Sequence, residues 1–118
     1  MRTISYIIPV YRAAAYIETS AFSLLCQTYP DIEYIFVDDC SPDNSVEILM
    51  QVVGRFPQRQ GHVKVIRLSR NSGSATARNA GLDSAMGKYV MFADSDDWVE
   101  ATYVEDMVAK IDANQSDI

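Results

Sequence analysis

Four short apolar segments recur along the chain at intervals of about thirty residues, and longer mixed stretches separate them. Each segment is rich in β-branched or aromatic side chains, which favour strands. The predicted strands are Ile4–Val10, Tyr34–Val37, Val63–Leu68 and Tyr89–Ala93. The second and fourth are apolar on both faces, which is typical of central parallel strands covered by helices.

The first two intervening stretches carry helix signals. Apolar residues return at i, i+4, i+7 and i+8 in the first stretch, and Pro30 ends it. These apolar positions are Ile17, Ala21, Leu24 and Leu25. The second helix is predicted to begin with Ser41 as its N-cap and Pro42 as its first helical residue.

Two further helices complete the pattern. One is predicted over residues 74–86, rich in alanine so that it can approach a sheet closely, with Gly87 as its stop. The other begins near Thr102, which forms a capping box with Glu105. The longest loop is expected over residues 56–62. The order βαβαβαβα predicts an α/β fold with a mostly parallel sheet and helices on both faces.

Length and charge narrow the class of protein. A chain of 118 residues makes one domain, and its net charge of -6 disfavours a nucleic-acid partner. Its two cysteines are too few for a disulfide framework, and no apolar run reaches the roughly 18 residues of a membrane span. We therefore expect a cytoplasmic domain, with any membrane association supplied by segments outside this chain.

Polar residues gather where the predicted strands end. Asp38 and Asp39 follow the second strand, residues 69–73 the third, and residues 94–97 the fourth. In open α/β sheets, ligands bind outside the carboxyl ends of the strands. Of the adjacent acids, one is expected to face a ligand while the other supports a loop. The alternative is that Asp38, Asp39 and Asp43 only favour the start of the next helix.

Asp94 and Asp96 have the spacing of a cation site. In an extended segment, residues two apart point the same way, so both carboxylates can converge on Mg²⁺ or Mn²⁺. The alternative is a turn whose acids cap the next helix. Arg78 can face these acids or a phosphate, or be a solvated surface residue. Residues 71–74 can offer backbone amides to an anion, or form a simple turn.

The ordered set of motifs resembles the inverting glycosyltransferases of family 2, which have the glycosyltransferase A fold. The matching segments are Ile7–Tyr11, Gln27–Tyr29, Glu33–Asp43, Asn71–Gly73, Ala77–Gly81 and Gly87–Asp97. Each motif is weak alone, but the set is specific and covers essentially the whole chain. Cys40 stands where the family often has Gly or Asn, and we expect little effect from it.

The resemblance implies a nucleotide-sugar donor, most often a UDP-sugar, bound with Mn²⁺ or Mg²⁺. By this resemblance Pro9 and Tyr11 flank the base and Asp39 hydrogen-bonds it. Arg78 lies near the nucleotide. Asp94 and Asp96 bind the metal, with Asp96 the more direct ligand and Asp94 nearer the ribose.

The resemblance also implies what residues 1–118 lack. They correspond to the nucleotide-sugar-binding part of a truncated catalytic domain, so the general base and the site for a saccharide or lipid-linked acceptor are expected beyond residue 118. We assign no catalytic residue here and expect this chain alone to be inactive in transfer. Two alternatives remain: a haloacid dehalogenase-like phosphatase with Asp94 as nucleophile, and a non-catalytic nucleotide-sugar-binding module.

Overall fold

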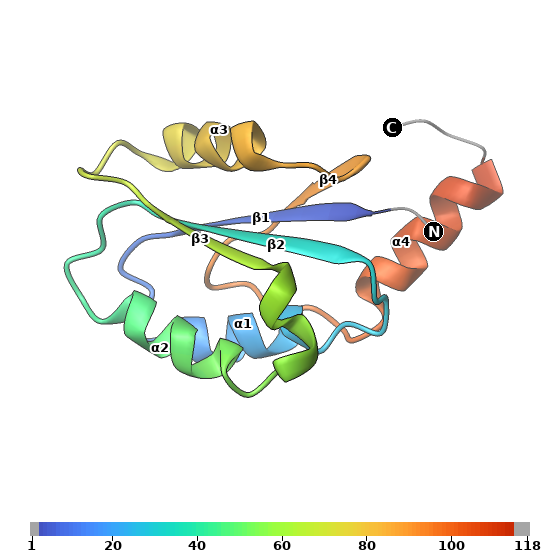
Figure 1. Cartoon of the computed structure of the whole chain (residues 1–118), viewed down its shortest axis with the longest axis horizontal. Helices are drawn as coiled ribbons and strands as arrows, with labels where there is room; N and C mark the ends of the chain where they lie inside the picture. Colours follow the sequence, from blue (N-terminus) through green and yellow to red (C-terminus); the bar gives the residue numbers. More distant parts are fainter. Residues whose placement is uncertain (1–2, 115–118) are drawn as a thin grey trace.

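The computed structural model describes residues 3–114 as a parallel sheet with helices on both faces (Figure 1). The strands are β1 (Ile4–Val10), β2 (Ile32–Asp38), β3 (Val63–Arg67) and β4 (Tyr89–Phe92). The helices are α1 (Ile17–Leu25), α2 (Ser45–Val53), α3 (Ser74–Ser84) and α4 (Tyr103–Asn114), and a 3-10 helix spans Pro57–His62. The strand order is β3-β2-β1-β4. The predicted α/β fold and its element order are confirmed.

α1 and α2 cover one face of the sheet (Figure 1). The larger core lies on this face. Tyr6 and Tyr34 stack across neighbouring strands with ring centroids 6.4 Å apart, and Phe36 continues the row 6.5 Å from Tyr34. Burial raises the pKa of both tyrosines above the ordinary value. The Tyr34 hydroxyl donates to the Leu24 carbonyl of α1, so the row also anchors a helix.

The opposite face is covered by α3, which lies close to β1 because Gly81 faces the sheet. A methyl group added at Gly81 would come within 2.5 Å of Ile7 Cγ2. Ile7 packs in a small cluster with Ile35, Val37 and Ala77, all fully buried. The small residues of this helix thus allow the close approach expected from the sequence.

β4 differs from its prediction as a central strand. Among residues 3–114 it pairs only with β1, and it forms an edge of the sheet. Tyr89 is buried in the larger core, but Val90 and Phe92 on the other face are 38% and 47% exposed. The physical reason is that α3 packs over β1 and β2 and does not extend over β4. β2, by contrast, is central as predicted.

The start of α2 and the N-terminal cap of α4 were predicted wrongly, whereas α4 begins at Tyr103, next to the predicted Thr102. α2 begins at Ser45, because the Ser41 hydroxyl accepts the Arg12 amide and does not cap a helix. The predicted capping box at α4 is also absent. The Thr102 hydroxyl instead donates to the Asp106 carboxylate, and the Glu105 carboxylate accepts a bond from the Thr28 hydroxyl in the loop after α1.

The ends of two helices also lie earlier than expected. α1 stops at Leu25, well before Pro30, since the carbonyls that follow bind the Arg59 guanidinium. α3 stops at Ser84, because the Met86 amide donates to the Glu33 carboxylate. The predicted loop over 56–62 is largely the 3-10 helix. None of the helices within residues 3–114 is long and apolar enough to cross a bilayer.

Replacing Gly81 by alanine tests the close packing of α3. Gly81→Ala is expected to lower the free energy of unfolding by about 1–3 kcal/mol, because the new methyl group overpacks against Ile7. Urea denaturation measures this. Gly61→Ala is the matched control, since a Cβ there meets nothing within 4 Å. Equal stability of the two variants would contradict the close approach.

Candidate functional site

A pocket of about 310 Å³ lies at the carboxyl ends of the strands. It is lined by Pro9, Val10, Tyr11, Asp39, Asn71, Gly73, Ser74, Asp94 and Ser95. Parallel pairing produces this convergence, because the ends of β1 and β2 lie opposite each other at Val10 and Asp38. The structure therefore brings together Pro9, Tyr11, Asp39 and Asp94, which the sequence analysis had selected from three separate segments.

Asp38, the last residue of β2, and Asp39, the next residue, lie in different surroundings. Asp39 lines the pocket and is 4% exposed, and its two oxygens accept the Ser72 amide at 2.7 Å and the Gly73 amide at 2.9 Å. Asp38 lies outside the pocket lining, where it accepts the Ser41 amide at 3.1 Å and pairs with Arg67 at 3.8 Å. The amides of Ser72 and Gly73 thus already donate to Asp39. These two amides of residues 71–74 are therefore not free for the predicted binding of an anion.

The loop that carries Tyr11 is fixed by a clasp formed by Ser41, Asp43 and Ser45. The amides of residues 12–14 donate, in order, to the Ser41 hydroxyl at 3.3 Å, the Ser45 hydroxyl at 2.9 Å and the Asp43 carboxylate at 3.3 Å. The Ser45 hydroxyl also bonds to Asp43. This bond lowers the pKa of the Asp43 carboxyl below its ordinary value. The sequence placed Asp43 among the acids but gave no signal that its partner is the neighbouring loop.

The acidic loop, residues 94–97, follows β4. Carboxylate oxygens of Asp94, Asp96 and Asp97 lie within 4.8 Å of one another, and all three side chains are exposed. Asp97 also folds the loop, because its carboxylate accepts the Asp94 amide at 3.2 Å. Arg78 of α3 lies 3.7 Å from Asp94. A third carboxylate, that of Asp97, therefore lies beside Asp94 and Asp96, the pair that was predicted from its spacing of two residues.

This donor set fits a hard divalent cation. Mg²⁺ and Mn²⁺ prefer carboxylate oxygens and retain several waters or phosphate oxygens as ligands. Exposed carboxylates leave room for those ligands, and a cation would relieve the repulsion among the three acids. Arg78 supplies one positive charge at the side of the cluster, where it partly offsets the same repulsion.

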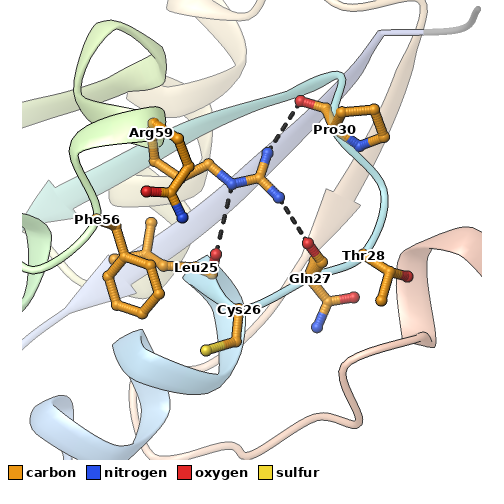
Figure 2. Close-up of a pocket in the computed structure, with 8 residues that line it drawn as sticks. Leu25, Cys26, Gln27, Thr28, Pro30, Phe56 and Arg59 are labelled. Carbon is orange, nitrogen blue, oxygen red and sulfur yellow. Dashed lines mark hydrogen bonds between the residues drawn. The ribbon is translucent and has the colours of Figure 1, made fainter.

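A second pocket, of about 430 Å³, lies beside the end of α1 and contains none of the predicted site residues (Figure 2). Its cation, Arg59, is 6% exposed. The guanidinium donates to the carbonyls of Leu25, Gln27, Tyr29 and Pro30 and lies 5.5 Å from the centroid of the Tyr34 ring. Arg59 thus closes the connection from α1 to β2, a role that no local sequence motif indicates.

Cys40 adopts a left-handed backbone, with φ +59°. Only glycine enters this region freely, although asparagine tolerates it better than most residues. This conformation explains why Gly or Asn suits the position directly after the acidic pair. The thiol is exposed and lies 3.8 Å from the Ser69 carbonyl.

Comparison with known proteins now identifies the family. A sequence profile described as Glycosyl transferase family 2 matches residues 5–118. The chain belongs to this family. Among curated relatives, Glycosyltransferase GlyA of Streptococcus pneumoniae serotype 4 is 40% identical over 115 residues, which cover 98% of this chain and 16% of GlyA. The family assignment leaves the haloacid dehalogenase-like alternative without support.

Solved structures of glycosyltransferases share the fold. The S. aureus protein TarS, in a crystal structure with UDP, superposes with a TM-score of 0.84 at 34% identity, covering 94% of this chain and 32% of that one. A mannosyltransferase from Pyrobaculum calidifontis, in complex with GDP-Man and Mn²⁺, gives a TM-score of 0.77 at 25% identity, covering 82% and 28%. The chain thus spans about a third or less of the length of these three proteins.

Replacing Cys40 by glycine is expected to stabilise the protein by up to about 1 kcal/mol, because it removes the Cβ from a left-handed residue. Thermal and urea unfolding measure the gain. Cys40→Ala is the control, since it removes the thiol but keeps the Cβ, and it should bring no gain. A stabilisation shared by both variants would instead assign the effect to the thiol.

The clasp predicts a dependence of stability on pH. A lowered pKa means that Asp43 stabilises the folded state at pH values above the ordinary aspartate pKa of 3.8, and that this contribution is lost as the pH falls through the folded-state pKa. Asp43→Asn should cost no more than about 1 kcal/mol at neutral pH, because the carboxylate is exposed, and nothing at low pH. Urea titrations at several pH values test this. Ser45→Ala should weaken the same dependence, and an unchanged profile would argue against the clasp.

Proposed function

We propose that residues 1–118 bind a nucleotide-sugar donor, a UDP-sugar, together with Mg²⁺ or Mn²⁺, as the donor-binding part of an inverting glycosyltransferase. One observation carries this proposal: a single pocket has the buried carboxylate of Asp39 on one side and Asp94 of the acidic loop on another. A nucleoside diphosphate matches both groups. Its base presents N–H donors to a carboxylate such as that of Asp39, and its negative phosphates would be neutralised by a cation held at Asp94.

The base is proposed to lie between Pro9 and Tyr11, with a ring N–H donating to Asp39. Both Asp39 oxygens already accept a backbone amide, but each carboxylate oxygen has two lone pairs and can accept a second bond. The Tyr11 loop is held by the clasp, so this side of the pocket is formed before a ligand enters. The crystal structure of TarS with UDP supports a uridine nucleotide for a related chain.

The diphosphate is proposed to lie over the acidic loop, near Arg78. Asp94 and Asp96 would hold the cation, which when bound would neutralise charge on the departing diphosphate. Arg78 is close enough to Asp94 to reach a phosphate oxygen beside it. The complex of the mannosyltransferase with GDP-Man and Mn²⁺ supports a divalent cation together with the nucleotide sugar.

The proposed reaction is a single displacement with inversion. The oxygen of an acceptor hydroxyl forms a bond to the anomeric carbon while the bond from that carbon to the diphosphate oxygen breaks. The hydroxyl proton passes to a general base, which we assign to no residue within 1–118. The acceptor, a saccharide or lipid-linked sugar, and the transfer step itself belong to the longer protein in this proposal.

Calorimetric titration with UDP, with and without Mn²⁺, tests the donor site. We expect Mn²⁺-dependent binding of UDP and at least about a tenfold loss in Asp96→Ala, since even indirect disturbance of a metal site costs roughly 10–100-fold in affinity. Asp83→Ala on α3 is the control, because Asp83 is an exposed acid that is not among the residues lining the pocket, and binding should be retained.

Three results would change the proposal. Tighter binding of GDP than of UDP would overturn the choice of uracil as the base. UDP binding that is equally tight with and without Mn²⁺ would overturn the role of the acidic loop as a cation site. Donor binding without sugar transfer by the longer protein would instead identify a non-catalytic nucleotide-sugar-binding module.

A further inference from the structure

Hydrogen bonds to other elements attach the chain on either side of the acidic loop. On one side the Ala93 amide donates to the Ile7 carbonyl of β1 at 3.1 Å. On the other side the Val99 amide donates to the Ser23 hydroxyl of α1 at 3.3 Å. Between these points the bonds that the structure shows for the backbone of residues 94–97 join Asp94 and Asp97. The position of the carboxylates therefore depends on where the chain after Trp98 is attached.

That attachment centres on Gln27, just beyond the end of α1. Its side chain is buried, in a residue 5% exposed. The amide nitrogen donates to the Glu100 carbonyl at 2.8 Å and to the Ser23 carbonyl at 3.1 Å, and the amide oxygen accepts the Val104 amide at 2.9 Å. Gln27 thus joins the end of α1 to Glu100, in the segment after the acidic loop, and to the first turn of α4.

The backbone around Gln27 is in turn fixed by two hydrogen bonds. Its backbone carbonyl accepts a bond from the Arg59 guanidinium at 2.7 Å, as Figure 2 shows. The next residue, Thr28, adds a backbone bond from its amide to the Ala101 carbonyl at 2.8 Å. The buried Arg59 therefore holds the backbone of Gln27, and the side-chain amide of Gln27 holds the segment that follows the acidic loop.

We propose that Gln27 is a positioning residue for the cation site, acting through residues 99–104 on the carboxylates of the acidic loop. It does not line the donor pocket and is not among the clustered acids. Its side chain uses two donors and one acceptor at once, which a carboxylate or an apolar side chain of the same length cannot do. This inference rests on the proposed function, because it assigns the acidic loop to a cation.

A purely structural role would make a different prediction. If Gln27 only stabilised the fold, its loss would lower the free energy of unfolding but leave the folded protein with its full affinity for the metal. Trp98, the single tryptophan of the chain, separates these cases. It follows Asp97 directly and is 60% exposed, so its fluorescence anisotropy reports on the acidic loop and needs no metal.

The experiment compares Gln27→Leu with Thr28→Val in the full chain. Thr28→Val is the matched control, since it removes the 2.6 Å bond from the Thr28 hydroxyl to Glu105 of α4 but keeps the attachment of residues 99–104. Binding of Mn²⁺ alone is measured by electron paramagnetic resonance, at a temperature where circular dichroism shows each variant folded. We expect about tenfold weaker binding and lower Trp98 anisotropy in Gln27→Leu, and neither change in Thr28→Val.

If Gln27→Leu does not fold, Ser23→Ala replaces it, because that variant removes the acceptor for the Val99 amide together with one bond inside α1, to the Ser20 carbonyl. It should shift both measurements in the same direction by less. Wild-type affinity for Mn²⁺ in a folded variant would overturn the proposal. If the wild-type protein fails to bind Mn²⁺, the proposed function loses its cation. The Trp98 anisotropy then decides whether Gln27 positions the loop at all, and an unchanged anisotropy would overturn that as well.

Discussion

β1 pairs with β2 along its whole length, from Ile4 opposite Ile32 to Val10 opposite Asp38, and with β4 from Ile4 to Ile7. Because all of these pairs are parallel, the loops that leave the three strands emerge at one edge of the sheet. Shifting β1 by one residue would turn its buried side chains to the opposite face and displace Pro9 and Tyr11 from Asp39. The pocket that we propose for the donor is therefore a consequence of this register.

The pocket is also held together without any ligand. Asp39 binds the amides before α3, the clasp binds the amides after β1, and Gln27 holds the segment after the acidic loop. Each contact joins elements that are distant in the sequence. Such preorganisation lowers the entropic cost of binding, because few groups need to be ordered when a nucleotide arrives.

The sequence predicted the strands and the residues at their ends well, because apolar runs and the polar residues after them are local patterns. Asp39 and Asp94 were found in this way, whereas Pro9 and Tyr11 were predicted from the family resemblance. Helix ends were predicted less well, since those of α1 and α2 depend on Arg59 and on the clasp, which are tertiary contacts. The edge position of β4 was missed for the same reason, because apolar composition does not reveal whether a helix covers both faces.

The groups that hold the pocket differ in their chemistry from those that hold the scaffold behind it. The contacts of Asp43 rely on a carboxylate with a lowered pKa, and they weaken when that carboxylate loses its charge in acid. Those of Gln27 rely on a side-chain amide, which carries no charge and does not titrate. Acidification would thus loosen the loop that carries Tyr11 while leaving the attachment made by Gln27 at the end of α1 unchanged.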